Sequence, residues 1–148
     1  MARKKKTKPP EKGHSKSRGT AGGAEAHFER GMALAQKGEL KAAAEAFGEA
    51  AGINPGFTEA EVNLGNALRA LGRLEESQAA YRRAIEAEPD FPDAQFNLGG
   101  LLEEMGDFDG AVAAYRRVLD LQPANIQAIG NLAALFEANN RLDEAKAA

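Results

Sequence analysis

The chain repeats itself at a fixed interval of 34 residues. The segment "AEVNLGNALRALGR" (residues 60–73) returns as "AQFNLGGLLEEMGD" (residues 94–107), with Asn, Leu and Gly at matching places. Small, aromatic and proline positions share this spacing: Gly31, Gly65, Gly99 and Ala133; Phe47, Tyr81 and Tyr115; Pro55, Pro89 and Pro123. A period of this length restricts the fold to an array of similar units that stack on one another.

Each unit is predicted to be two helices joined by a tight turn. Apolar residues recur at helical spacing, as in Leu64, Leu68 and Leu71, and β-branched residues are sparse. A glycine in mid-unit suits the left-handed residue that ends a helix, and Asn140 is the nearest substitute in the last unit. These glycines are Gly38, Gly72 and Gly106. The prolines cannot continue a helix and therefore close each unit.

The small residues predict how the two helices of a unit pack. Gly65 on the first helix and Ser77 on the second leave little side chain where the axes cross, which allows a separation of about 8 Å. Tyr81 is expected to fill the gap beyond. The stretch T-E-A-E at residues 58–61 is expected to start a helix as a capping box, and Pro92 suits the first turn of another.

The two parts of the chain differ sharply in charge. Residues 1–23 contain eight Lys or Arg residues against the single Glu11, with no aromatic residue. Such a segment cannot bury enough surface to offset its conformational entropy, so we predict a disordered basic tail. Residues 24–148 carry eleven basic and twenty-one acidic side chains. For the tail, a weak polyanion contact, nuclear import and plain solvation are all open interpretations.

The 34-residue period, with its small, aromatic and proline positions, resembles the tetratricopeptide repeat. The resemblance covers residues 24–148, with complete units at 24–57, 58–91 and 92–125 and a partial fourth unit at 126–148. It implies an all-α fold, a right-handed superhelical solenoid of helix-turn-helix repeats whose first helices line a concave groove. The first unit departs from the pattern at His27 and Arg30, which stand where apolar residues are usual.

Groove positions carried over from the family supply candidate peptide-binding residues. Asn63, Asn97 and Asn131 share one position, and an amide can hold a peptide backbone because it has both a donor and an acceptor. This register resembles the asparagine ladder in the repeats of the protein O-GlcNAc transferases, although Glu29 interrupts it. The alternative is that these amides bond within their own repeat. The other candidates are Asn66, Phe28, Phe96, Arg69, Glu59, Asp93 and Glu103.

The groove charges favour a basic or neutral peptide. One base, Arg69, faces seven acids: Glu25, Glu29, Glu59, Asp93, Glu103, Glu104 and Glu137. A second family mode clamps the C-terminal carboxylate of heat-shock chaperones through a Lys at the fifth position of a unit. This chain has Phe28, Val62, Phe96 and Gly130 there. We do not expect the clamp, because an anionic peptide would be repelled.

Arginines recur on the second helices, where Arg82 with Glu86 and Arg116 with Asp120 are expected to form pairs one turn apart. A solvated outer face is the simplest interpretation of this pattern, and an anion-binding strip is the alternative.

The sequence predicts no enzyme, cofactor or metal site. Neighbouring carboxylates such as Glu103 and Glu104 diverge on a helix, the chain has no Cys, and His14 and His27 lack partners at metal-ligand spacing. No Gly-rich phosphate loop follows a strand, because no strand is apparent. No stretch approaches the roughly 18 apolar residues of a membrane span, and no secretory signal is present, which favours a cytoplasmic protein.

Two functional classes fit these features. The first is a protein-interaction scaffold that binds an extended peptide segment in the groove. The second is the N-terminal substrate-targeting module of a longer enzyme, since ladder-bearing repeats are often fused upstream of glycosyltransferase, sulfotransferase or methyltransferase domains. The second helix of the fourth unit would be short, leaving Ile129, Leu132 and Phe136 only partly covered. We therefore expect either that the array continues or that this end packs against another molecule, and a frayed but tolerated end is the remaining alternative.

Overall fold

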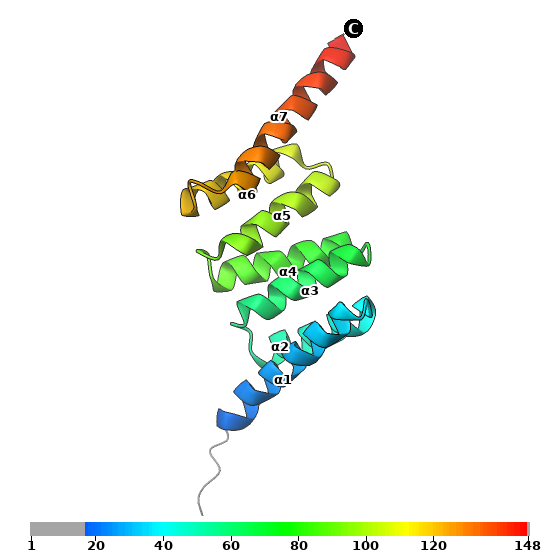
Figure 1. Cartoon of the computed structure of the whole chain (residues 1–148), viewed down its shortest axis with the longest axis vertical. Helices are drawn as coiled ribbons and strands as arrows, with labels where there is room; N and C mark the ends of the chain where they lie inside the picture. Colours follow the sequence, from blue (N-terminus) through cyan, green and yellow to red (C-terminus); the bar gives the residue numbers. More distant parts are fainter. Residues whose placement is uncertain (1–16, 148) are drawn as a thin grey trace, which may run out of the picture.

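A computed structural model describes residues 17–147 as seven helices stacked in chain order (Figure 1). The helices are α1 (Ser17–Gln36), α2 (Leu40–Ile53), α3 (Thr58–Ala70), α4 (Leu74–Ala87), α5 (Pro92–Glu104), α6 (Phe108–Leu121) and α7 (Ile126–Ala147). Successive pairs form layers from α1 at one end to α7 at the other, and this part of the chain contains no strand. The predicted all-α solenoid is confirmed.

Glycine turns close the first helix of each pair, as predicted. Gly38, Gly72 and Gly106 have φ angles of 76°, 77° and 77°, which lie in the left-handed region that favours glycine. After α3, the N–H of Arg73 donates to the carbonyl of Leu68 at 2.9 Å, which closes the helix end. Pro55, Pro89 and Pro123 each follow the end of a second helix by two residues.

Aromatic rings lie directly against glycines where paired helices cross. A β-carbon added to Gly65 would come within 2.5 Å of the Tyr81 ring, and Gly99 meets the Tyr115 ring in the same way. The Ser77 hydroxyl donates to the carbonyl of Gly65 at 2.7 Å. Both rings are buried. The predicted close approach is therefore confirmed, with the ring as the surface that the glycine contacts.

The expected capping box at residues 58–61 is wrong. Thr58 is the first residue of α3, and the preceding Phe57 makes no side-chain bond to the helix end. The carboxylate of Glu61 bonds instead to Arg83 of α4, with Nε–Oε1 at 2.8 Å and Nη2–Oε2 at 3.0 Å. A bidentate ion pair is stronger than one bond to a backbone N–H, so the carboxylate turns toward the neighbouring helix. Pro92 does begin α5, as predicted.

The fourth unit has no turn at Asn140, contrary to expectation. Helix α7 runs straight through this position, and no described residue other than glycine has a positive φ. The left-handed conformation is costly for a residue with a β-carbon. Bonds along the helix also favour continuation: Asn140 Nδ2 donates to Glu144 at 2.9 Å, and Arg141 pairs with Glu137 at 2.7 Å. Residues 141–147 therefore extend α7 rather than form a second helix.

Outer-face arginines bond between elements rather than along one helix. Among the described ion pairs, neither Arg82 nor Arg116 has the expected partner one turn away. Their neighbours Arg83 and Arg117 instead reach Glu61 and Asp90. In the first helix pair the carboxylate is on the second helix, where Glu49 of α2 has an oxygen 2.7 Å from His27 Nδ1 of α1.

At the N-terminal end, α1 begins at Ser17, seven residues before the predicted start of the first repeat. Residues 1–16 of the predicted basic tail, including His14, lie outside the described residues. None of the described helices is long and apolar enough to cross a membrane.

Candidate functional site

Two adjoining hollows lie along the first helices of successive repeats. The first hollow, of about 300 Å³, lies between α3 and α5, and its lining residues are Glu59, Val62, Asn63, Asn66, Phe91, Asp93, Phe96 and Asn97. The second hollow, of about 380 Å³, is lined by Arg69, Phe96, Asn97, Gly100, Glu103, Glu104, Tyr115 and Asn131. Because both include Phe96 and Asn97, they form one continuous groove, which we call the α3–α5–α7 groove.

All the candidate residues but one line this groove. The exception is Phe28, whose ring centroid lies 5.7 Å from that of Phe47 and 4.9 Å from that of Phe57. It belongs to the apolar core of the first repeat. Phe96 makes the equivalent contact, with its ring centroid 5.6 Å from that of Tyr115, and it also lines the groove.

The three asparagines share a register but differ in their bonds. Asn63 Nδ2 donates to the carbonyl of Glu59 in its own helix at 2.8 Å, and Asn131 Nδ2 donates to the Tyr115 hydroxyl at 3.2 Å. The Asn97 amide has no hydrogen-bond partner among the described residues. Two of the three amides therefore already use one donor within the protein, while their oxygens still have acceptor capacity.

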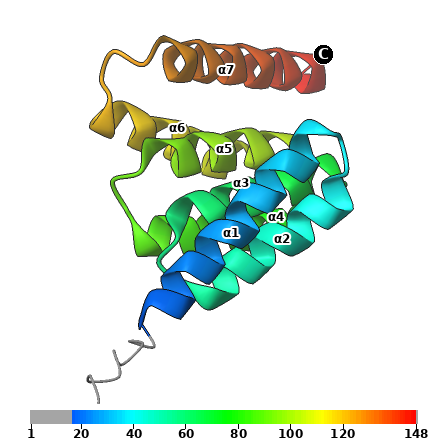
Figure 2. The ribbon, with the colours of Figure 1, turned by 60° about the horizontal axis from the view of Figure 1, so that its bottom comes forward.

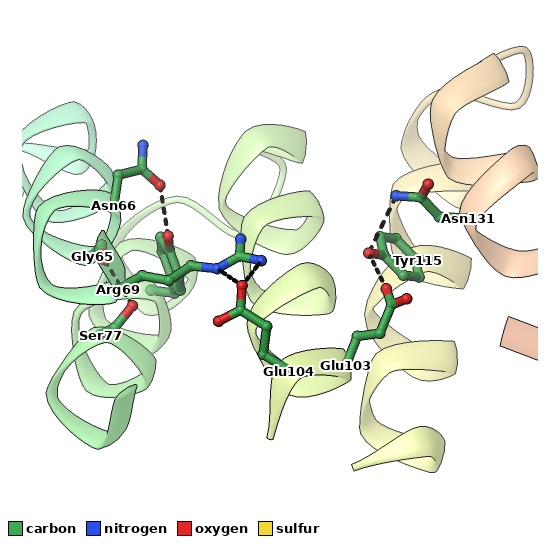
Figure 3. Close-up of polar contacts among 9 residues, drawn as sticks. Gly65, Asn66, Arg69, Ser77, Glu103, Glu104, Tyr115 and Asn131 are labelled. Carbon is green, nitrogen blue, oxygen red and sulfur yellow. Dashed lines mark hydrogen bonds and ion pairs between the residues drawn. The ribbon is translucent and has the colours of Figure 1, made fainter. Parts of the chain in front are cut away.

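Tyrosine hydroxyls from second helices reach the groove past the glycines. Tyr115 donates to Glu103 at 3.1 Å while accepting from Asn131, and Tyr81 donates to the Asn66 oxygen at 2.6 Å (Figure 3). Burial raises the pKa of both phenols above their ordinary value of 10.0. The sequence did not predict Tyr115 as a groove residue, although its position over Gly99 was a signal for it.

An ion pair joins two repeats across the groove. Arg69 of α3 donates to the same Glu104 oxygen through Nε at 2.9 Å and Nη2 at 2.6 Å. Gly100 leaves room for the guanidinium, since a β-carbon there would lie 3.0 Å from Nη1. The hydrogen bond to Glu104 raises the pKa of Arg69. Figure 3 shows Glu104 and Glu103 pointing apart, toward Arg69 and Tyr115.

The charge of the groove is therefore uneven. Arg69, expected to be the one base facing the groove acids, is neutralised by Glu104 in the second hollow. In the first hollow, Glu59 and Asp93 are exposed and form no ion pair within the described residues. They line this hollow together with the apolar side chains of Val62 and Phe96.

No group of three or more His, Asp or Glu side chains that could hold a metal ion occurs in residues 17–147. His27 is instead bonded to Glu49.

Comparison with protein-family models matches the tetratricopeptide repeat over residues 24–57 and again over residues 62–126 and 101–148. These spans cover most of the chain. The chain belongs to the tetratricopeptide repeat family. No curated protein matches this tetratricopeptide chain in sequence.

Solved tetratricopeptide structures agree with this assignment. The first TPR of Spaghetti (RPAP3), bound to HSP90 peptide SRMEEVD, has a TM-score of 0.78 at 19% identity and covers 81% of this chain and 95% of that chain. The Arabidopsis OM64 TPR domain has a TM-score of 0.77 at 20% identity, with coverage of 80% and 98%. MamA has a TM-score of 0.76 at 25% identity, with coverage of 82% and 71%. The first two likenesses show the fold alone.

Proposed function

We propose that this tetratricopeptide protein is an interaction scaffold whose α3–α5–α7 groove binds an extended peptide segment. One observation carries the proposal: asparagines from three successive repeats line adjoining hollows. Each asparagine lies 34 residues from the next, and the amides supply donors and acceptors to a peptide backbone. The RPAP3 domain, solved with a peptide, supports a peptide-binding role for this fold.

We further propose that the peptide is basic or neutral. Glu59 and Asp93 leave the first hollow negatively charged, whereas in the second hollow Arg69 offsets Glu104 and only Glu103 remains. A cationic side chain can place its stem on Phe96 and its charge between the two free carboxylates. The HSP90 peptide SRMEEVD is rich in acidic residues, and the fifth-position Lys needed to clamp its carboxylate is absent here. A groove of this charge repels such a ligand.

The proposal predicts a defined response to substitution of the asparagines. Replacing Asn63, Asn97 and Asn131 together by Ala removes the amides that hold the backbone, so affinity for groove-binding peptides should fall at least tenfold. Each lost hydrogen bond contributes about 1 kcal/mol. Peptide arrays identify the ligands, and fluorescence anisotropy of the selected peptides measures the change. The control is Gln78→Ala, which removes an amide on α4 outside both hollows.

A charge variant tests the ligand class separately. Glu59→Gln with Asp93→Asn should lower the affinity for lysine-containing peptides and reduce the dependence of binding on salt, while neutral peptides bind as before. Undiminished binding by the triple Asn→Ala variant would contradict groove binding. A wild-type preference for acidic peptides would contradict only the proposed charge class.

A further inference from the structure

One face of α7 lacks the cover that every earlier first helix has. Helices α1, α3 and α5 are each packed against the second helix of their own pair. Helix α7 has no such partner, because it runs straight through residue 140 and its end projects away from the α5–α6 layer (Figure 1). Figure 2 shows α7 as the outermost helix of the stack. Large apolar side chains are exposed along it: Ile126 (83%), Ile129 (48%), Phe136 (42%) and Leu142 (59%).

The end of α7 nevertheless carries the sequence of a covering helix. Leu142 and Ala145 lie two 34-residue repeats after Leu74 and Ser77 and occupy the same positions of the unit. In the second repeat Ser77 is fully buried against α3, and Leu74 packs against the core. In α7 the matching residues are exposed. Residues 142–147 therefore match the first half of a covering helix such as α4, but they are directed away from their own repeat.

We propose that two copies of the chain form a domain-swapped dimer, in which residues 141–147 of each copy pack against the fourth repeat of the other. The hinge is Asn140. The earlier repeats turn at a glycine with φ near 77°, and an asparagine at this place makes the turn costlier and the straight helix cheaper. Exchange between two copies gives α7 a packing partner without requiring the turn. Because each copy does the same for the other, the result is a closed dimer with two-fold symmetry.

The earlier repeats also give the register of the exchange. Ser77 bonds to the carbonyl of Gly65, so Ala145 of one copy should lie against Ala133 of the other. Because the helices run antiparallel, Leu142 then lies level with Phe136, whose ring packs on Phe108 of α6 with centroids 5.7 Å apart. Arg141 meets Glu137, its partner at 2.7 Å in the single chain, so the ion pair is exchanged rather than lost. Ala133 and Ala145 are both small, which permits close helix packing.

Mass measurement tests the proposal. Sedimentation equilibrium of the 148-residue chain should give twice the 15.7 kDa mass, with dissociation on dilution. Asn140→Gly permits the turn seen at the other repeats and should shift the chain to the monomer. The matched variant Asn140→Ala favours the straight helix and should leave the dimer intact.

Cysteine cross-linking tests the register, because the chain has no cysteine of its own. Ala133→Cys and Ala145→Cys in one chain lie about 18 Å apart along a straight helix, beyond the roughly 7 Å limit of a disulfide. Oxidation should therefore give a covalent dimer, and a covalent monomer when Asn140→Gly is added. A monomeric wild-type chain at all concentrations would overturn the proposal, as would a dimer that Asn140→Gly leaves intact or that fails to cross-link.

Discussion

A missing β-carbon sets the distance between paired helices at Gly65. The Tyr81 ring occupies the space that any side chain at this position would need. Gly65→Ala should therefore destabilise the protein by about 1–3 kcal/mol, the usual cost of overpacking a buried contact. Urea unfolding followed by circular dichroism measures the change.

Gly48 provides the matched control. It lies within α2, and a β-carbon there meets nothing within 4 Å. Gly48→Ala should raise stability by roughly 0.5–1 kcal/mol, because alanine is the better residue inside a helix. Equal effects at the two positions would show that the ring contact does not set the helix spacing.

The two tyrosines predict loss of stability at alkaline pH. Burial raises the pKa of Tyr81 and Tyr115 in the folded chain, so the folded state keeps these protons when the unfolded state has released them. Their contribution to stability is complete below about pH 10, the ordinary phenol pKa, and is lost as pH rises through the higher folded pKa.

Ultraviolet absorbance reads these groups alone, because the chain has two tyrosines and no tryptophan. Tyrosinate should appear above pH 10 together with loss of helical signal, whereas the chain in denaturant should titrate near its ordinary value. The prediction would be contradicted if both tyrosines titrated at the ordinary phenol pKa while the helical signal stayed intact.

Residue positions were predicted better than residue contacts. The 34-residue register assigned the positions of the asparagines, the glycines and the aromatic rings, because residues 34 apart occupy the same place in successive repeats. It did not predict that Arg69 would reach Glu104 in the next repeat, since that bond also depends on the space left by Gly100.

At the scale of elements, α3 and α4 are joined by the ion pair between Glu61 and Arg83. The Glu61 side chain is only 6% exposed, whereas Arg83 is half exposed. Arg83→Met keeps the apolar stem but leaves a buried carboxylate unpaired, so stability should fall by about 1–3 kcal/mol. Thermal and urea unfolding measure this loss.

The double variant Glu61→Gln with Arg83→Met should recover part of that stability, because no charge then remains buried. Arg82→Met is the control, since Arg82 forms no ion pair among the described residues. Strictly additive effects of the two substitutions would show that the pair contributes no coupling energy.

Helix α7 shows why element boundaries were harder to predict than element types. Its helical spacing was recognised from the sequence, but its length was not. Whether the chain turns at Asn140 depends on the packing gained by folding residues 141–147 back against the cost of a left-handed asparagine. The packing gained depends on tertiary contacts, so the local sequence around Asn140 does not determine it.

At the scale of the whole molecule, contacts join mainly helices adjacent in the chain, as expected of a solenoid. An additional contact links α3 to α5, and the Arg69–Glu104 pair lies on the same concave side. Both side chains are partly exposed, so the pair contributes about 1 kcal/mol at most and is weakened by salt.

Removing this pair should lengthen the molecule without unfolding it. In Glu104→Gln, the radius of gyration from small-angle X-ray scattering should exceed that of the wild type at low salt, and the two should converge as salt is added. Because a dimer would obscure the comparison, both chains are measured as Asn140→Gly variants. A salt-independent difference would contradict an electrostatic origin.

The position of this bond gives the solenoid a mechanical asymmetry. Bending that opens the groove stretches the Arg69–Glu104 pair, whereas bending that closes the groove does not. The contact between the second and third repeats should therefore be stiffer toward bending that opens the groove than toward bending that closes it. The Arg69–Glu104 pair therefore limits the length of the groove in the free protein. A peptide that lies across both hollows would bind to a groove of this length.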